Sequence, residues 1–426
     1  MMTDKIKRIF AAGMMLVASV VAVTVPCSAQ STRRTAMPAK YSYFPTYHNP
    51  TPGQIPLIAW TVVSPEFTDS VFLSDEYFDR IHRCGINAIT NIVGFDARGE
   101  RILDQAQRHG LKVFVQQSPK TSDAGRRMAE YFRDKPVVAG YLLQDEPTVK
   151  NFADLVKVRN AIYDVDTTRL VYTNLLPIVP GKVTGTDTYL QYMQGSEQAL
   201  RLPLLSYDHY PVVRKNGKTS TKPEFYENLE YARQVSTENR IPFWAFGLIM
   251  GHYSYPVPTL AHLRFQTFNA LAYGAQGIQY WRYILSSNAD YEATEAPVTM
   301  EGQSTRVWDA LQTVNSEIQG YAPVFLGCTV RNIGHLGSIP QGAGKLEHLP
   351  APFTKIKPGK KGILVSSIVN EDRHYVVFCN HDVNKKQKVK IGWTGRLRQM
   401  MPDGSSRTVK NSSVTLDPGS YAIFTY

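Results

Sequence analysis

Two adjacent acids, Asp145 and Glu146, follow an apolar run in this sequence. They belong to "GYLLQDEP", residues 140–147, in which Pro147 comes directly after the acids. A carboxylic acid in apolar surroundings holds its proton to higher pH, because burial disfavours the charged form. Such a group can protonate the leaving oxygen of an acetal. The ordinary alternative is that one of the two caps the next helix, since acids favour helix N-termini.

The acids lie within a repeating pattern. Eight apolar runs rich in β-formers alternate with eight amphipathic stretches, from "IPLIAWTVV" at Ile55 to a last helical stretch near residue 325. Strands that are apolar on both faces are typical of parallel sheets, and the alternation implies right-handed crossovers. We therefore predict a (β/α)8 TIM barrel over residues 55–326. A doubly wound open sheet is the alternative, but no G-x-G-x-x-G follows the first run.

The segments on either side of the barrel differ from it. Residues 327–426 hold short alternating runs such as "HYVVFCNHD" and "YAIFTY", with "PDGSS" and "DPGS" as turns. These patterns predict a small C-terminal antiparallel β-sandwich. Residues 30–54 are expected to form an N-terminal arm that lies on the barrel.

Residues 1–29 have the pattern of a secretory signal peptide. Lys5, Lys7 and Arg8 precede an apolar stretch, and "CSAQ" offers small residues for cleavage after Ala29. We expect an exported protein that is periplasmic, extracellular or associated with the outer membrane. Cys27 adds the alternative of a lipid anchor, although "TVP" before it is a poor lipobox. No other segment approaches the roughly 20 apolar residues of a transmembrane helix.

Charge and cysteine usage narrow the class of protein further. The net charge is +11, and residues 351–426 carry thirteen basic and five acidic side chains. The lysines of this tail fit solvated edges, or else a patch for an acidic glycan; an exported protein is not expected to bind nucleic acid. The odd count of Cys84, Cys328 and Cys379 argues against a disulfide framework and a zinc site, and a Cys328–Cys379 bridge stays open. We expect no metal or cofactor.

The strand ends supply the candidate site residues. In such barrels the active site is built at the C-terminal ends of the strands. There the sequence places acids, amides and aromatic rings, without a lysine for a Schiff base, histidines paired for a metal or a phosphate-binding glycine loop. Such a set favours an oligo- or polysaccharide as substrate. The candidate catalytic acids are Glu146, Asp208 and Asp145, and the candidate substrate ligands are Trp60, Asn91, Gln116, Asn174, His209, Tyr210, Trp281 and Arg282.

Structural roles compete with these assignments. Asp208 precedes Pro211 by three residues, where a turn residue is common. Trp281 could belong to the core, and a buried histidine such as His209 is more often structural than catalytic.

The strand-four ending, with Glu146 before Pro147, resembles the Asn-Glu-Pro ending of the large clan of (β/α)8 retaining glycosidases that includes β-galactosidases and cellulases. "SYDHYP", "IPFWAF" and "GAQGIQYWRY" also look like secreted glycosidase-like proteins of Bacteroidetes-type bacteria. The resemblance covers most of the chain. It implies a secreted glycoside hydrolase in which Glu146 is the general acid/base.

Two departures from the clan leave the mechanism open. Asp145 stands where the clan has asparagine, and the clan's nucleophile, a glutamate at the end of strand seven, has no counterpart in "IPFWAFGLIMGHYSYP". Asp208, ranked ahead of Asp145, could supply the second carboxylate. Alternatively, Asp145 and Glu146 act like the strand-four pair of barrel hexosaminidases, where the acetamido group of the substrate is the nucleophile. The third alternative is a barrel that binds carbohydrate without cleaving it.

Overall fold

The computed structural model describes residues 44–179 and 183–426. The predicted signal peptide, Cys27 and residues 30–43 of the predicted arm lie outside this part of the chain. Within the described end of the arm, Tyr47 is buried, and its ring meets Trp244 edge-on with centroids 6.4 Å apart. Among the described residues, no helix combines the length and apolar character needed to cross a membrane.

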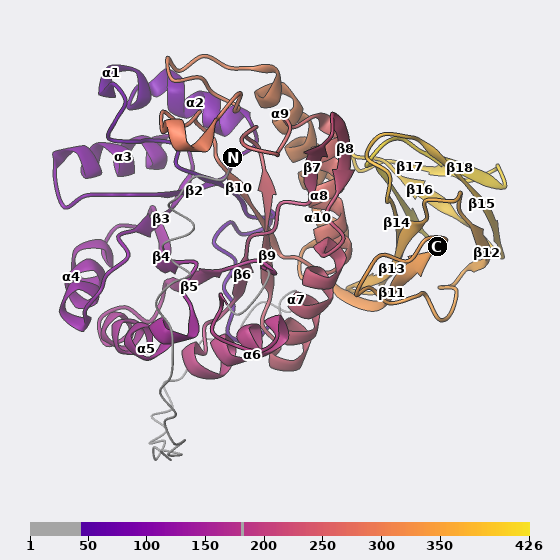
Figure 1. Ribbon diagram of the computed structural model, residues 1–426, viewed down its shortest axis with the longest axis horizontal. Coiled ribbons are helices and arrows are strands. Elements are labelled where there is room, and N and C mark those ends of the chain that lie inside the picture. The colour runs from indigo at the N-terminus through magenta and orange to yellow at the C-terminus, as the bar shows by residue number, and fades with distance from the viewer. Residues whose placement is uncertain (1–43, 180–182) are drawn as a thin grey trace. The chain divides into compact units, whose positions relative to one another are not determined.

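Eight parallel strands close into a barrel, as the sequence predicts (Figure 1). Their order around the barrel is β1-β10-β9-β6-β5-β4-β3-β2. Almost all their residues are buried, which is why the runs are apolar on both faces. The strands are β1 (Leu57–Trp60), β2 (Ala88–Asn91), β3 (Lys112–Gln116), β4 (Val138–Asp145), β5 (Leu170–Leu175), β6 (Leu205–Tyr207), β9 (Phe243–Leu248) and β10 (Gly277–Trp281).

Helices cover the outside of the barrel and alternate with the strands (Figure 1). Several begin at a side-chain cap; Asp96, for example, accepts a hydrogen bond from the Gly99 N–H at 2.8 Å. The alternating helices are α2 (Asp75–Arg83), α3 (Ala97–Arg108), α4 (Ser122–Phe132), α5 (Val149–Tyr163), α6 (Tyr189–Leu200), α7 (Phe225–Asn239), α8 (Leu260–Ala272) and α9 (Arg306–Gly320). Short helices α1 (Asp69–Phe72), η2 (Ala289–Tyr291) and α10 (Ala322–Phe325) lie in connections.

A β-hairpin between β6 and α7 was not predicted. It consists of β7 (Val212–Lys215) and β8 (Lys218–Thr221), joined by Asn216 and Gly217. Both turn residues have positive φ, 51° and 73°, which a two-residue hairpin of this type requires. The Asn-Gly pair was therefore a usable sequence signal for this hairpin.

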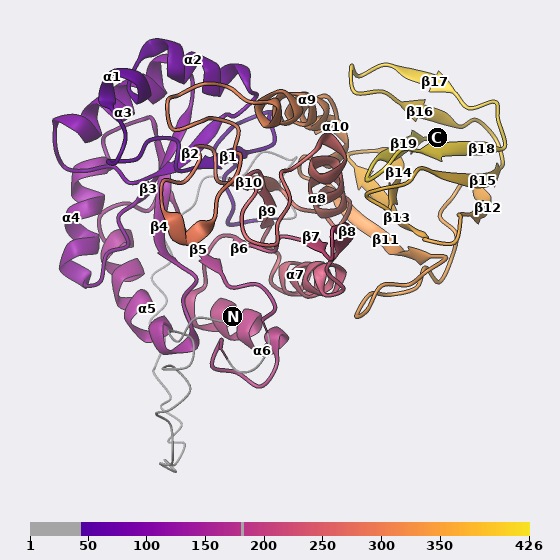
Figure 2. The same ribbon diagram turned by 45° about the horizontal axis from the view of Figure 1, so that its top comes forward.

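The C-terminal segment folds into two antiparallel sheets, which confirms the predicted sandwich (Figure 2). One sheet has the order β11 (Thr329–Leu336), β13 (Ile363–Asn370), β14 (Arg373–Asn380), β19 (Tyr421–Thr425), β16 (Arg398–Met400) and β17 (Ser406–Thr408). The other has the order β12 (Phe353–Lys357), β15 (Gln387–Trp393) and β18 (Ser413–Leu416). A separate core lies between them and includes Phe353, Phe378 and Phe424. The sequence runs did not reveal β11, β12, β17 and β18, which are short or carry many polar residues.

Helix α8 joins the barrel to the larger C-terminal sheet. The Phe268 ring stacks on Tyr421 with centroids 3.5 Å apart, and the Ser366 hydroxyl donates to the Ala272 carbonyl at 2.7 Å. Cys379 lies at this contact, and its thiol faces the Phe268 carbonyl at 3.6 Å. The three cysteines in the described part of the chain are buried and free, so Cys328 and Cys379 are not bridged here.

Candidate active site

Strand β4 delivers both acids to the barrel mouth through a bulge. Leu142 pairs with Tyr172 and Asp145 pairs with Asn174, so three steps along β4 match two along β5. A bulge of this kind redirects the side chains that follow it. Glu146 then adopts a left-handed φ of 48°, and its N–H donates to the Asn174 carbonyl at 2.8 Å. As a result both acids are exposed, although neighbours on a regular strand would point in opposite directions.

Neither acid caps the helix that follows. The N-cap of α5 is Thr148, and its N–H donates to the Asn151 side-chain oxygen at 2.8 Å. The ordinary explanation for an acid pair before a helix therefore does not apply to Asp145 and Glu146.

Three carboxyl groups meet around one amide. Asn174 Nδ2 donates to Asp145 Oδ1 at 3.0 Å and to Asp208 Oδ1 at 3.1 Å. The side chains of Glu146 and Asp208 also lie within interaction range, and Asp208 opposes the rise in the Glu146 pKa. Asp208 is only 8% exposed, whereas Asp145 and Glu146 are open to solvent. The predicted acids thus form one cluster with the predicted ligand Asn174 at its centre.

The cluster favours protonated carboxyls. Burial, followed by the charges of Glu146 and Asp145, raises the pKa of Asp208 well above its usual value. Glu146 is exposed as a residue, but the protein around its carboxyl group partly desolvates it and raises its pKa; the charge of Asp145 adds to this rise and Asp208 opposes it. The pKa of Asp145 is raised by burial too, against the opposing hydrogen bond from Asn174. These shifts favour the protonated forms, and Glu146 combines a raised pKa with exposure at the barrel mouth, as a general acid requires.

Aromatic rings line the mouth beside the acids. Tyr210 meets Tyr255, Tyr255 meets His252, His252 meets Tyr291 and Tyr291 meets Trp281, with ring centroids 4.9–6.3 Å apart. We call these five residues the aromatic row. The charges of all three acids help to raise the pKa of Tyr210, after burial, so one end of the row lies at the carboxyl cluster. Tyr253, which is 55% exposed, contacts the rings of His252 and Tyr291.

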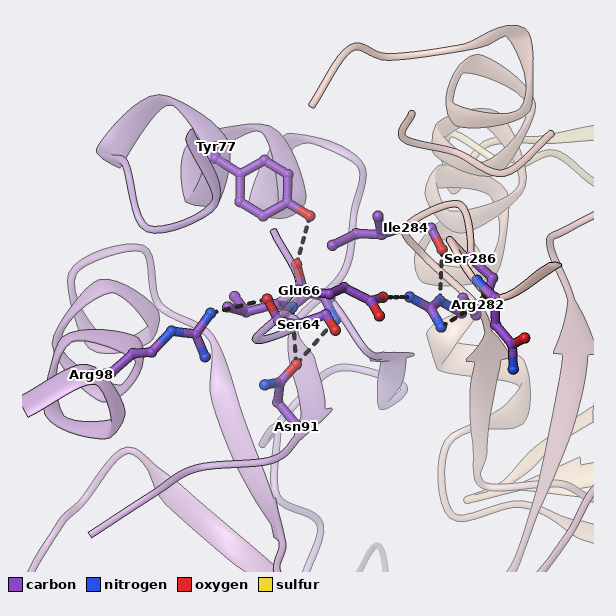
Figure 3. A network of polar contacts seen from close by, with 11 residues as sticks. Ser64, Glu66, Tyr77, Asn91, Arg98, Arg282, Ile284 and Ser286 are labelled. Atoms are coloured by element: carbon purple, nitrogen blue, oxygen red, sulfur yellow. Dashed lines mark hydrogen bonds and ion pairs between the residues drawn. The ribbon is translucent and has the colours of Figure 1, made fainter. Parts of the chain in front are cut away.

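A network of polar contacts, shown in Figure 3, holds the loop between β1 and α1 in place. Arg282 donates to Glu66 at 3.1 Å and to the Ile284 carbonyl at 2.8 Å. Arg98 donates to the Ser64 carbonyl at 3.0 Å from the other side. Burial would raise the pKa of Glu66, but hydrogen bonds from Ser287, Arg282 and Ser64 outweigh it and lower that pKa. Glu66, which the sequence did not single out, is thus held as a carboxylate.

Four predicted substrate ligands, Trp60, Asn91, Arg282 and His209, have polar atoms bound within the protein. Trp60 is 2% exposed and donates to Gln279 at 3.0 Å, and Arg282 is bound to Glu66. The Asn91 side-chain oxygen accepts from the N–H groups of Val62 and Val63, at 3.1 and 3.0 Å.

His209 is turned towards α7, where Nδ1 meets the Asn228 oxygen at 3.0 Å. Burial lowers the pKa of its imidazole to about 4, so the ring is neutral. Tyr210 and Trp281 are partly exposed at the mouth, and Gln116 is half-buried at the end of β3. Position at a strand end alone could not show which of the predicted ligands are bound within the protein and which are partly exposed at the mouth.

Strand β9 ends without an acid. Leu248 is held by Gln266, which accepts from its N–H at 2.9 Å, and the buried Ile249 and Met250 follow. Within the described ranges, no group of three histidine, cysteine, aspartate or glutamate side chains is placed to hold a metal ion.

Comparisons with known proteins support the barrel and the reaction class. A sequence model of glycoside hydrolase family 42, described as β-galactosidase, matches residues 156–321. Among curated proteins, none matches the chain. The fold is similar to a catalytic mutant of a family 42 β-galactosidase from G. stearothermophilus, at 9% identity and a TM-score of 0.60, over 88% of this chain and 98% of that one.

Two further solved structures have the same architecture. A β-galactosidase from Bacillus circulans sp. alkalophilus has a TM-score of 0.60 at 10% identity, over 88% of this chain and 99% of that one. A family 5 glycoside hydrolase from Bacteroides vulgatus has a TM-score of 0.53 at 11% identity, over 87% and 89%. The structural likeness shows the fold, and with the family match the predicted class is confirmed: a glycoside hydrolase that works with carboxylates.

Proposed function

We propose that this protein is an exported glycoside hydrolase in which Glu146 is the general acid/base. Glu146 donates its proton to the glycosidic oxygen as the bond to the anomeric carbon breaks, and the leaving sugar departs as an alcohol. Water then bonds to the anomeric carbon and gives a proton back to Glu146, which completes the hydrolysis. The observation that carries the proposal is the exposed Glu146 at the barrel mouth, with a pKa raised by burial and by Asp145. The partly exposed rings of the aromatic row, those of Tyr210, Tyr255, Tyr291 and Trp281, offer surfaces against which sugar rings can stack.

Asp208 does not flank the scissile bond in this proposal. Glycosidase carboxylates stand about 5–5.5 Å apart for retention and about 6.5–9.5 Å apart for inversion. Asp208 is buried and its side chain interacts with that of Glu146, so it is not placed to face the opposite side of a sugar bound at Glu146. We therefore reverse the order expected from the sequence and rank Asp145 ahead of Asp208 as the second functional acid.

A substrate-assisted reaction is the second candidate. It is favoured by the adjacent, exposed Asp145 and Glu146 and by the absence of an acid from described residues 243–258, where β9 ends. The acetamido oxygen of the substrate would attack the anomeric carbon, while Asp145 orients the acetamido N–H and Glu146 protonates the leaving oxygen.

The test is turnover of a panel of aryl glycosides by the wild type and by Glu146→Gln. The panel includes β-galactosides, because the matching family is described by that activity, and 2-acetamido sugars for the second candidate. We expect kcat/KM to fall about 100- to 10,000-fold in the variant, the usual contribution of a general acid. Glu76→Gln, a change on the exposed face of α2, is the matched control. Unchanged turnover in Glu146→Gln would refute the assignment, and a wild type that binds sugars without cleaving any would favour a carbohydrate-binding barrel.

Export has its own test. The pattern in residues 1–29 supports it, so the full chain expressed in a Gram-negative host should lose this segment and leave the cytoplasm. An uncleaved chain in the cytoplasmic fraction would contradict export, and labelling of Cys27 with a fatty acid would indicate the lipid anchor.

A further inference from the structure

A chain of buried polar side chains crosses the barrel interior and ends at the acids. Trp60 Nε1 donates to Gln279 Oε1 at 3.0 Å, and Gln279 Nε2 donates to Ser206 Oγ at 2.7 Å. Ser206 donates in turn to Asn174 Oδ1 at 2.9 Å. These four side chains come from β1, β10, β6 and β5, and each is at most 2% exposed.

The chain has a fixed direction. An indole nitrogen can only donate, so the oxygen of the Gln279 amide must face Trp60 and its nitrogen must face Ser206. Ser206 accepts that hydrogen bond and has one proton left, which goes to the Asn174 oxygen. The Asn174 nitrogen is then directed at Asp145 and Asp208, to which it donates at 3.0 and 3.1 Å.

We propose that Asn174 is a positioning residue for the catalytic acids, and that the chain from Trp60 through Gln279 and Ser206 determines which end of its amide faces them. This inference rests on the proposed function, because it explains how the hydrogen bonds donated to the proposed catalytic acids are maintained. A donated hydrogen bond favours the charged form of a carboxyl. Asn174 therefore counteracts burial at Asp145, and a reversed amide would place an oxygen against the carboxyl oxygens.

The experiment measures the pKa of Asp145 by carbon-13 NMR in a chain labelled at the aspartate carboxyl carbons. Asp145→Asn and Asp208→Asn assign the signals. Ser206→Ala cuts the chain next to Asn174, whereas Trp60→Phe removes one of the two donors to the Gln279 oxygen, because the Tyr172 hydroxyl also donates to it at 3.3 Å. Trp244→Phe is the matched control, because it removes an indole N–H from the same barrel interior that has no hydrogen-bond partner.

We expect Ser206→Ala to raise the pKa of Asp145 by about half to one unit, the equivalent of one hydrogen bond. Trp60→Phe should raise it less, because Tyr172 still donates to the Gln279 oxygen. Trp244→Phe should leave it unchanged, with all variants judged folded by their thermal transitions. A pKa of Asp145 that stays at the wild-type value in Ser206→Ala, or that rises equally in Trp244→Phe, would overturn the inference. The titration needs no substrate, so its failure is separate from a failure of Glu146→Gln to lower turnover.

Discussion

Asp166 holds the base of the strand that carries the catalytic acids, and its removal should destabilise the barrel. It lies between α5 and β5 and is 4% exposed. One carboxyl oxygen accepts from the N–H and hydroxyl of Thr168, at 3.0 and 2.8 Å. The other accepts from the Tyr141 hydroxyl and from Arg169, both at 2.9 Å. Tyr141 lies on β4, four residues before Asp145.

The size of the effect follows from which bonds Asp166→Asn keeps. The amide oxygen can still accept from Thr168, but the amide nitrogen would face two donors, Tyr141 and Arg169. Breaking a buried ion pair costs about 3–5 kcal/mol. Arg169 keeps its hydrogen bonds to the carbonyls of Val138 and Lys135, at 2.9 Å each, so we expect the low end of this range, about 3 kcal/mol.

The assay is urea unfolding followed by circular dichroism, with Asp154→Asn as the control. Asp154 and Lys157 also form an ion pair between residues three apart in sequence, at 2.8 Å. Their side chains, however, are 71% and 69% exposed. Such an exposed pair contributes about 0.5 kcal/mol or less. A cost for Asp166→Asn no larger than that for Asp154→Asn would refute this reasoning.

The dependence on pH gives a second check. Burial alone would raise the pKa of Asp166, but its hydrogen bonds and Arg169 outweigh burial and lower it. A lowered pKa stabilises the folded state fully above the unfolded value of about 3.9, and the contribution is lost as the pH falls through the folded value. The difference in stability between wild type and Asp166→Asn should therefore shrink below about pH 4.

Three further outcomes are expected. Asp145→Asn removes the charge that, after burial, raises the pKa of Glu146, so the alkaline limb of the kcat/KM profile should move to lower pH; an unmoved limb would contradict the coupling. Glu66→Gln weakens the contact with Arg282, so amides of residues 61–68 should exchange hydrogen faster, whereas unchanged exchange would show that the loop is held without it. Tyr253→Ala should weaken oligosaccharide binding about 2- to 10-fold in calorimetry, with no change in melting temperature, because its ring is exposed.

Much of the architecture was accessible from the sequence because it depends on neighbouring residues. Apolar runs alternating with amphipathic stretches predicted the barrel, and the position of Asp145 and Glu146 after such a run predicted acids at its mouth. The Asn216-Gly217 turn was equally local, and its hairpin could have been predicted.

Tertiary structure decided which strand-end residues face the mouth. Trp60 donates a hydrogen bond to Gln279, which is 219 residues away in the sequence. Arg282 donates to Glu66, which is 216 residues away. The bulge between β4 and β5 directs Asp145 and Glu146 together, and the contact between Glu146 and Asp208 joins β4 to β6. The periodicity of a segment shows that it forms a strand. The direction of its last side chains depends on partners from distant strands, and only the closed barrel brings those partners together.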